Sequence, residues 1–335
     1  MDALRKDHHF VPKLYLKQWA RDGAIAAYGL LVPHERVPLW KNHSLKGIAY
    51  REHLYTQIVG GIESDEFERW LDRNFEAAAE PAIMRAVTDQ RLRPDDWRAI
   101  VRFAFAQDVR TPRRLKEFLQ RQTVDLPEML KFVVESAVQE ASADRAAVMP
   151  GKTMSASGFP LKIEIKHQPD GTGLLKTEAV VGRSMWIWTL KQLLTATIHK
   201  VSYKGWSVLK AAKGCSWPTS DNPLIRLNYM DERSYNFEGG WGVPNGDILL
   251  PLSPTHVLHR CAGRRPLPRN SRLDSATSET IKRIIIEHAD RYVFATDEFE
   301  VHKIRVRRVD RTQYMRERDD WARWHAEQTA AELTA

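Results

Sequence analysis

The chain has 335 residues, of which 43% are hydrophobic and 28% charged, and it carries a net charge of +8. This composition indicates a folded protein with a sizeable core and excludes a largely disordered chain. It has no apolar run of roughly 18 residues, no secretory signal and only two cysteines, which excludes a transmembrane helix and a disulfide framework; we therefore expect a cytoplasmic protein without a membrane partner.

The first part of the chain is predicted to contain short strands followed by helices. Residues 24–33 are predicted to form a strand, with residues 35–40 as its hairpin partner. A helical block follows, in which capping residues and prolines at the first helical position mark several starts. The predicted helices cover residues 64–87, 93–110, 112–122, 126–141 and 184–201, and residues 149–160 are predicted to form a loop or linker.

Past Tyr203 the pattern changes to strands. Lys213-Gly214 predicts a hairpin between residues 205–212 and 215–220. Further strands are predicted at residues 223–229, 247–253 and 255–262, a helix running into a strand at 278–296, and an edge or solvent-facing strand at 300–310.

These elements predict an α+β fold, with a helical bundle packed on a largely antiparallel sheet. We expect one domain over residues 1–312. Its helical part covers about 64–200 and its mainly β part about 203–312. A polar C-terminal helix is predicted at residues 313–335.

Basic residues concentrate late in the chain. Between Arg260 and Arg318 there are 15 lysines and arginines against 9 acidic residues, which contributes 15 − 9 = +6 of the total charge. A basic surface attracts phosphate-rich partners. The sequence therefore predicts nucleic-acid contact through the basic C-terminal region, with a solvated arginine-rich surface as the alternative.

Two adjacent histidines, His8 and His9, stand in the first motif, DHHFVPKLYLKQWA. Successive side chains of a strand point to opposite faces, so one of the two can face a given pocket. A neutral imidazole there can act as a general base or bind a metal. The alternative is a histidine at a helix entry that hydrogen-bonds to nearby backbone.

Gln107 and Arg110 share the apolar face of the predicted helix at 93–110. Phe103 and Ala104 precede Gln107 by four and three residues, and Arg110 follows it by three. A buried guanidinium requires partners, and its planar fork can clamp a carboxylate or phosphate. A structural arginine bonded to carbonyl groups at the helix end fits the pattern equally well.

Two junctions between predicted strands carry polar side chains. Ser220, Asp221 and Asn222 precede Pro223, and Asp and Asn side chains in such turns bond to the local backbone. Ser253 lies in the segment LLPLSP, which is typical of a bend. Both junctions are read as turns first, and both are also places where a ligand can be held.

Glu76 lies at the edge of the apolar stripe of the helix at 64–87, from where its carboxylate can reach a pocket. Glu80 follows four residues later on the same face. The chain contains no HExxH, no GxGxxG after a strand, no GxxxxGK[ST] and no GxSxG. Zinc proteases, common nucleotide-binding folds and serine hydrolases are therefore disfavoured.

Five motifs occur in order along the chain: HHFVPKLYLKQWA, AQDVRTP, TSDNPL, LLPLSP and HADRYVFA. Together they resemble the domain of unknown function 4238 (DUF4238) family from about residue 7 to residue 296. The resemblance implies bacterial occurrence and a single α+β domain, and it implies no established activity. It groups the candidate site residues, which we expect to gather in one hollow: His8 or His9, Glu76, Gln107, Arg110, Asp221 and Asn222.

This set contains a base, carboxylates and an anion clamp, which suits phosphodiester hydrolysis with or without a divalent metal such as Mg²⁺ or Mn²⁺. Our leading hypothesis is a nucleic-acid-directed hydrolase, a nuclease of the toxin or phage-defence kind. His9 would be the general base or a metal ligand, Asp221 and Glu76 would hold a metal or orient water, and Arg110 would stabilise charge on phosphate. The polar residues in binding positions would be Gln107, Ser220, Asn222 and Ser253.

Two alternatives remain open. The first is a non-enzymatic protein that binds a ligand or partner, in which the same residues form a structural polar network. The second is a hydrolase of a small nucleotide or other anion, which short pocket loops would suit better than an open groove.

Overall fold

The structure is a computed structural model that describes residues 4–143, 161–167 and 173–334, and its core contains a five-stranded antiparallel sheet. Its strands, in spatial order, are β10 (Trp206–Lys210), β15 (His256–Cys261), β14 (Gly246–Ser253), β12 (Ile225–Asp231) and β13 (Ser234–Asn236). The predicted loop at residues 149–160 lies outside the described residues.

Helices cover both faces of this sheet. β14 is buried along its whole length, as expected for a central strand covered on both sides. Leu250 and Leu252 share a core with α3 and α4, whereas Leu249 packs with Ile281 and Ile285 of α7. The predicted fold class is therefore confirmed as mixed α+β with mostly antiparallel sheets. The helices are α1 (Lys13–Leu16), α2 (Glu66–Leu71), α3 (Ala77–Val87), α4 (Pro94–Val109), α5 (Pro112–Ala143), α6 (Arg183–Thr195), α7 (Ser275–His288) and α8 (Arg311–Thr334), with short turns η1 (Lys17–Trp19), η2 (Asp72–Glu76), η3 (Thr197–Lys200) and η4 (Val301–Lys303).

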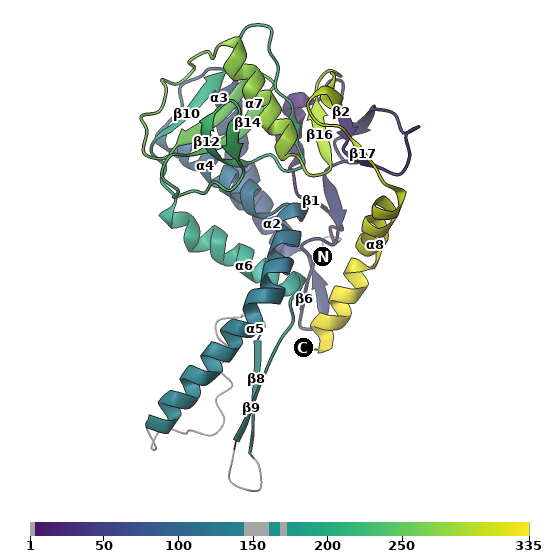
Figure 1. Cartoon of the computed structure of the whole chain (residues 1–335), viewed down its shortest axis with the longest axis vertical. Helices are drawn as coiled ribbons and strands as arrows, with labels where there is room; N and C mark the ends of the chain where they lie inside the picture. Colours follow the sequence, from purple (N-terminus) through teal and green to yellow (C-terminus); the bar gives the residue numbers. More distant parts are fainter. Residues whose placement is uncertain (1–3, 144–160, 168–172, 335) are drawn as a thin grey trace.

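A second sheet and several two-stranded pairs complete the fold. The four-stranded antiparallel sheet has the order β11 (Thr219–Ser220), β16 (Tyr292–Ala295), β2 (Ala24–Gly29) and β4 (Trp40–Ser44). The pairs are β1 (Asp7–His9) with β5 (Tyr50–Glu52), β3 (Leu31–Val32) with β17 (Arg308–Val309), β6 (Gln57–Val59) with β7 (Ile62–Ser64), and β8 (Leu161–His167) with β9 (Gly173–Ala179). Figure 1 shows α5 and the β8–β9 hairpin extending from the body, while α8 runs along another margin and ends near β6.

The predicted hairpin at Lys213-Gly214 is wrong. A turn does form there, since Cys215 N–H donates to Ala212 O at 3.0 Å. The chain beyond it leaves β10, because the buried Trp217 bonds through its indole to Ser278 O at 2.9 Å and through its backbone to Pro254 O at 2.7 Å. β10 pairs with β15, and β11 pairs with β16.

Three further expectations need correction. Residues 300–310 form the short turn η4 and the two-residue strand β17 rather than one strand, because Arg305 turns inward and donates to carbonyl groups at the end of α7. The two helices predicted at 112–122 and 126–141 are one helix, α5, which continues through Pro127 at the loss of one backbone donor. The strand that pairs with β2 begins at Trp40 rather than at residue 35.

Candidate active site

The histidine pair lies on β1, which pairs with β5 in the register His9 to Tyr50. As predicted for a strand, the two rings have different surroundings. His8 is fully buried and both ring nitrogens are used: Nε2–H donates to Arg5 O at 2.8 Å and Nδ1 accepts from Tyr55 N–H at 2.8 Å. Burial lowers the pKa of His8 to about 4, so this ring stays neutral and holds the backbone together.

His9 faces a cavity of about 700 Å³. Its side chain is buried, and its Nε2 has no hydrogen-bond partner among the described residues. Burial lowers the pKa of His9 below its ordinary value, and the charges of Lys13 and Arg110 act in the same direction, while backbone groups of Leu45 and Lys46 oppose them. At neutral pH the ring is therefore uncharged and can accept a proton.

Glu68 of α2 lines the same cavity. It is 8% exposed, and its Oε2 is buried without a hydrogen-bond partner in the described part of the chain. Burial raises the pKa of Glu68 to about 8, and Glu76 and Asp72 add to the shift, whereas Arg110 and the His9 backbone oppose it. A carboxyl group with this pKa carries a proton at neutral pH and can donate it.

Helix geometry brings three acidic residues to this cavity. Glu68, Asp72 and Glu76 follow one another at spacings of four, and all three line it. The intervening turn η2 is π-helical, a wider turn that is frequent at functional sites. Sequence reasoning found Glu76 and missed Glu68; the signal available was the spacing of four, followed towards the N-terminus.

Arg110 lies behind the cavity and does not line it. Its side chain is fully buried and donates three hydrogen bonds: Nη1 to Glu76 Oε1 at 2.7 Å, Nη2 to His9 O at 2.7 Å, and Nε to Phe10 O at 3.0 Å. The guanidinium therefore positions the β1 backbone and Glu76 relative to each other. This is a positioning role, and its partners are protein groups on each of the three nitrogens.

Asp221 lies elsewhere. Its Oδ1 accepts from Asp290 N–H at 2.9 Å and its Oδ2 from Arg291 N–H at 2.7 Å. Burial raises the pKa of Asp221 to about 7, and nearby Asp290 acts in the same direction. Asp221 lines a separate space of about 20 Å³ beside Glu317. The grouped residues are thus divided between two places.

The remaining candidates also lie away from the His9 cavity. Ser220 Oγ accepts from Asn222 N–H at 3.2 Å, and Thr111 Oγ1 lies 3.3 Å from Asn222 Oδ1. Ser253 Oγ accepts from a backbone amide in the bend between β14 and β15. Gln107 is fully buried, and neither atom of its amide has a hydrogen-bond partner in the described residues.

The chain matches one known protein family. Residues 7–299 match the family model described as protein of unknown function (DUF4238). The chain belongs to the DUF4238 family. The searches among curated proteins and among solved structures gave no significant match. Within the described residues, no helix has both the length and the apolarity needed to cross a membrane.

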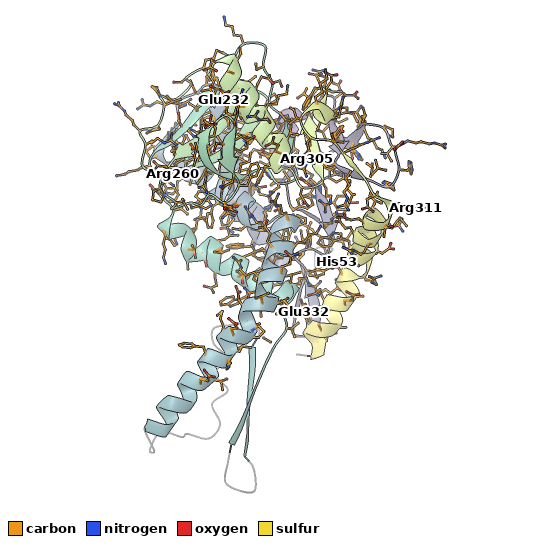
Figure 2. The ribbon with its side chains drawn as sticks, in the orientation of Figure 1. His53, Glu232, Arg260, Arg305, Arg311 and Glu332 are labelled. Carbon is orange, nitrogen blue, oxygen red and sulfur yellow. The ribbon has the colours of Figure 1, made fainter. Side chains whose placement is uncertain are left out.

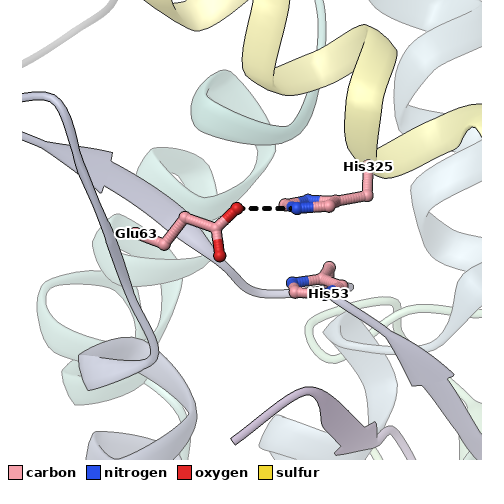
Figure 3. A group of neighbouring side chains, drawn as sticks. All are labelled: His53, Glu63 and His325. Atoms are coloured by element: carbon pink, nitrogen blue, oxygen red, sulfur yellow. Dashed lines mark ion pairs between the residues drawn. The ribbon is translucent and has the colours of Figure 1, made fainter. Parts of the chain in front are cut away.

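A second cluster of this DUF4238 chain has metal-ligand residue types. His53, Glu63 and His325 place one donor atom each within 4.8 Å of the others (Figure 3). Buried Arg183 donates from Nη1 to His325 Nδ1 at 3.0 Å, so the proton of neutral His325 lies on Nε2, which donates to Glu63 at 2.7 Å. In this hydrogen-bonded form Nε2 has no free lone pair for a metal, and the stacked rings of His53 and His325, 3.6 Å apart, join α8 to the body.

The basic C-terminal residues are mostly engaged within the fold. Arg305 donates to Ile286 O at 3.2 Å, Arg260 to Trp241 O at 3.0 Å and Arg272 to Ala211 O at 2.7 Å. Figure 2 shows Arg260, Arg305 and Arg311 widely separated across the molecule. The cations nearest to the His9 cavity are instead exposed residues of its lining: Arg5, Lys6, Lys13 and Lys46.

Proposed function

We propose that this DUF4238 protein cleaves phosphodiester bonds of nucleic acid in the His9 cavity, with RNA as the favoured substrate. One observation carries the proposal: His9 and Glu68 present unpaired, buried polar atoms at one cavity whose lining includes lysines. A neutral base and a protonated acid at the same place form an acid–base pair. RNA suits such a pair because its own 2′-hydroxyl supplies the nucleophile.

The proposed step balances protons between the two side chains. His9 Nε2 takes the proton of the 2′-hydroxyl, and the 2′ oxygen attacks phosphorus. The bond from phosphorus to the 5′ oxygen breaks, and Glu68 gives its proton to that leaving oxygen. The products are a 2′,3′-cyclic phosphate and a 5′-hydroxyl. Hydrolysis of the cyclic phosphate by water, with the roles reversed, restores both residues.

Three neighbouring residues support this pair. Lys13 and Lys46 line the cavity and are exposed, so they can contact phosphate oxygens as the negative charge grows. Arg110 keeps its bonds to Glu76 and to the His9 backbone, which fixes the base relative to the η2 turn that follows α2. Glu76 is thereby engaged by Arg110 and leaves Glu68 as the proton donor.

The experiment is cleavage of labelled single-stranded RNA and DNA by the purified full chain, with Mg²⁺, with Mn²⁺ and with EDTA. We expect RNA cleavage that persists in EDTA and leaves a 2′,3′-cyclic phosphate. His9→Ala and Glu68→Gln should each slow it by about 100-fold or more. Glu66→Gln is the matched control, because Glu66 lies on the same helix with its side chain 64% exposed.

The result that contradicts the proposal is equal background cleavage by the wild type and His9→Ala on every substrate. Cleavage of DNA alone, dependent on added metal and unaffected by Glu68→Gln, would contradict the acid–base roles. Thermal melts of all variants accompany the assay, so that a loss of folding is not mistaken for a loss of chemistry.

The alternative of a non-enzymatic protein draws on a different observation. Arg110 and Asp221, two of the grouped residues, have their polar atoms bonded to protein groups, as in a structural network. Under that alternative the wild type does not cleave RNA, and His9→Ala and Glu68→Gln change only its stability. The cleavage assay therefore separates the two functions.

A further inference from the structure

A second large cavity lies between the helices α4, α5 and α6 and the edge of strand β12. Its volume is about 730 Å³, within the range of roughly 300–1,000 Å³ that small-molecule sites occupy. None of the residues grouped above as a candidate site lines it. Its charged lining residues are Asp108, Arg114, Glu117, Arg121, Lys200 and Arg226, and its aromatic lining residues are Phe105, Phe118, Trp186 and Trp241.

The two acids of this cavity are already paired. Asp108 Oδ1 accepts from Arg114 at 2.8 Å, and its Oδ2 accepts from the Trp241 indole N–H at 2.8 Å. Glu117 accepts from Arg114 at 2.7 Å and from Arg113 at 3.0 Å. Each of the three nitrogens of Arg114 is therefore engaged, because its Nε also donates to Asp108 O at 2.9 Å. Of the other three cations, Arg121 and Lys200 have no acidic partner among the described residues, and Arg226 has one long ion pair with Asp108.

Among these three cations, Arg226 is the one that is buried in part and whose hydrogen bonding is incomplete. Its guanidinium makes no hydrogen bond with any described residue, and its Nε is buried. Its one ion pair is long: Nε lies 3.4 Å from Asp108 Oδ1, which also accepts from Arg114 at 2.8 Å. A partly buried guanidinium that has one long ion pair and no hydrogen bond is incompletely satisfied, and a bound anion would supply the missing acceptors.

The wall beside Arg226 is aromatic and held in place. The indole of Trp241 is fixed by its bond to Asp108 and packs edge-to-face on Phe105, with ring centroids 5.0 Å apart. Leu190 and Leu193 of α6 add apolar surface to the same cavity. A ligand that fills this space needs a planar or apolar body as well as an anionic group.

We propose that this cavity binds a nucleotide, with its phosphate on Arg226, Arg121 and Lys200 and its base against the aromatic wall of Trp241 and Phe105. The lining has four cations against two acids, an excess of 4 − 2 = 2 positive charges, which suits a phosphate with up to two negative charges better than a single carboxylate. The planar fork of Arg226 matches two phosphate oxygens at once. The site is distinct from the His9 cavity and does not depend on the proposed cleavage of RNA.

The experiment is calorimetric titration of the full chain with the four ribonucleoside monophosphates, and with adenosine and inorganic phosphate as part-ligands. We expect at least one monophosphate to bind, and each part-ligand to bind at least about tenfold more weakly. Arg226→Gln should weaken binding by about tenfold or more, because the charge-assisted bonds to phosphate are lost. Arg98→Gln, an exposed arginine of α4 outside the cavity, should leave binding unchanged.

A second pair of variants separates the two cavities. Arg121→Gln with Lys200→Gln removes two exposed cations of this cavity and should weaken binding, which decides the matter if Arg226→Gln fails to fold. Lys13→Gln with Lys46→Gln should leave binding unchanged. The proposal is overturned if no monophosphate binds up to about millimolar concentration, if the variants of this cavity bind like the wild type, or if binding is lost in the Lys13 and Lys46 variant.

Discussion

The His9 cavity and the Asp221 turn contain buried polar residues of the same types and differ in how those residues are bonded. At the turn, each oxygen of Asp221 accepts a backbone amide. His9 and Glu68 line a space of about 700 Å³, and their buried atoms Nε2 and Oε2 lack hydrogen-bond partners among the described residues. Burial of a polar residue therefore does not by itself indicate a site, whereas unpaired polar atoms in residues that line a cavity do.

The largest loss of stability is expected for a residue whose polar atoms are all bonded to protein groups. Arg110→Ala should lower the free energy of unfolding by about 3–5 kcal/mol, because it leaves Glu76 and two carbonyl groups without their buried donor. Denaturant melts measure the loss. Arg98→Ala, in the helix α4 that ends just before Arg110, should cost less than about 1 kcal/mol, since its ion pair is exposed. Equal melts for the two variants would show that the buried bonds of Arg110 do not stabilise the fold.

Asp221→Ala is the next largest change expected. It removes the acceptor of two backbone amides and should cost about 2–3 kcal/mol in unfolding free energy. Asp221→Asn keeps one carbonyl oxygen and should recover part of that loss. A wild-type melting curve for Asp221→Ala would show that the carboxylate does not support the fold and would return it to the list of site candidates.

Glu68, which has an unpaired buried oxygen, should make the free energy of unfolding depend on pH. Its folded pKa is about 8, above its ordinary value of 4.5, so folding favours its neutral form. The unfolded chain ionises first as pH rises, and this residue therefore removes stability between pH 4.5 and pH 8. Between pH 6 and pH 8 the wild type should lose about 2 kcal/mol that Glu68→Gln retains. Glu66→Gln should follow the wild type; parallel curves for wild type and Glu68→Gln would contradict the raised pKa.

The smallest effect is expected at the cluster that joins α8 to the body. His325→Ala removes the ring stack with His53, the bond to Glu63 and one acceptor of Arg183, while the buried Arg183–Glu332 pair remains. We expect a loss of about 1 kcal/mol. Faster amide hydrogen exchange should be confined to α8, whereas Arg323→Ala on the exposed side of the same helix should not change it. Unchanged exchange in His325→Ala would show that the stack does not hold the helix.

Local sequence patterns predicted the helices and strands better than they predicted which strands pair with each other. The strand at β1 separates His8 from His9 because alternation is a property of the backbone itself. The pairing of β10 with β15, by contrast, depends on where Trp217 is buried, which involves residues distant in sequence. Helical periodicity placed Gln107 and Arg110 on a buried face, and both are fully buried.

The sequence predicted only part of the candidate site, because local patterns mark residues but do not show which of them meet in space. Ordered motifs marked His9 and Arg110, and the apolar stripe of the helix marked Glu76; the structure joins the three through the bonds of Arg110. The motif at Asp221 is equally distinctive in sequence but serves a turn. Glu68 looks like an ordinary helical glutamate until the π-helical turn and the cavity place it beside His9.

The most direct measurement is the pH dependence of kcat/KM for RNA cleavage between about pH 5 and pH 10, in the wild type and Glu68→Gln. We predict a bell in the wild type, with an acid limb below pH 6.5 from His9 and an alkaline limb near pH 8 from Glu68. Glu68→Gln should be slower and should lack the alkaline limb. An alkaline limb that persists in Glu68→Gln, or a rate that does not change with pH in the wild type, would contradict the account.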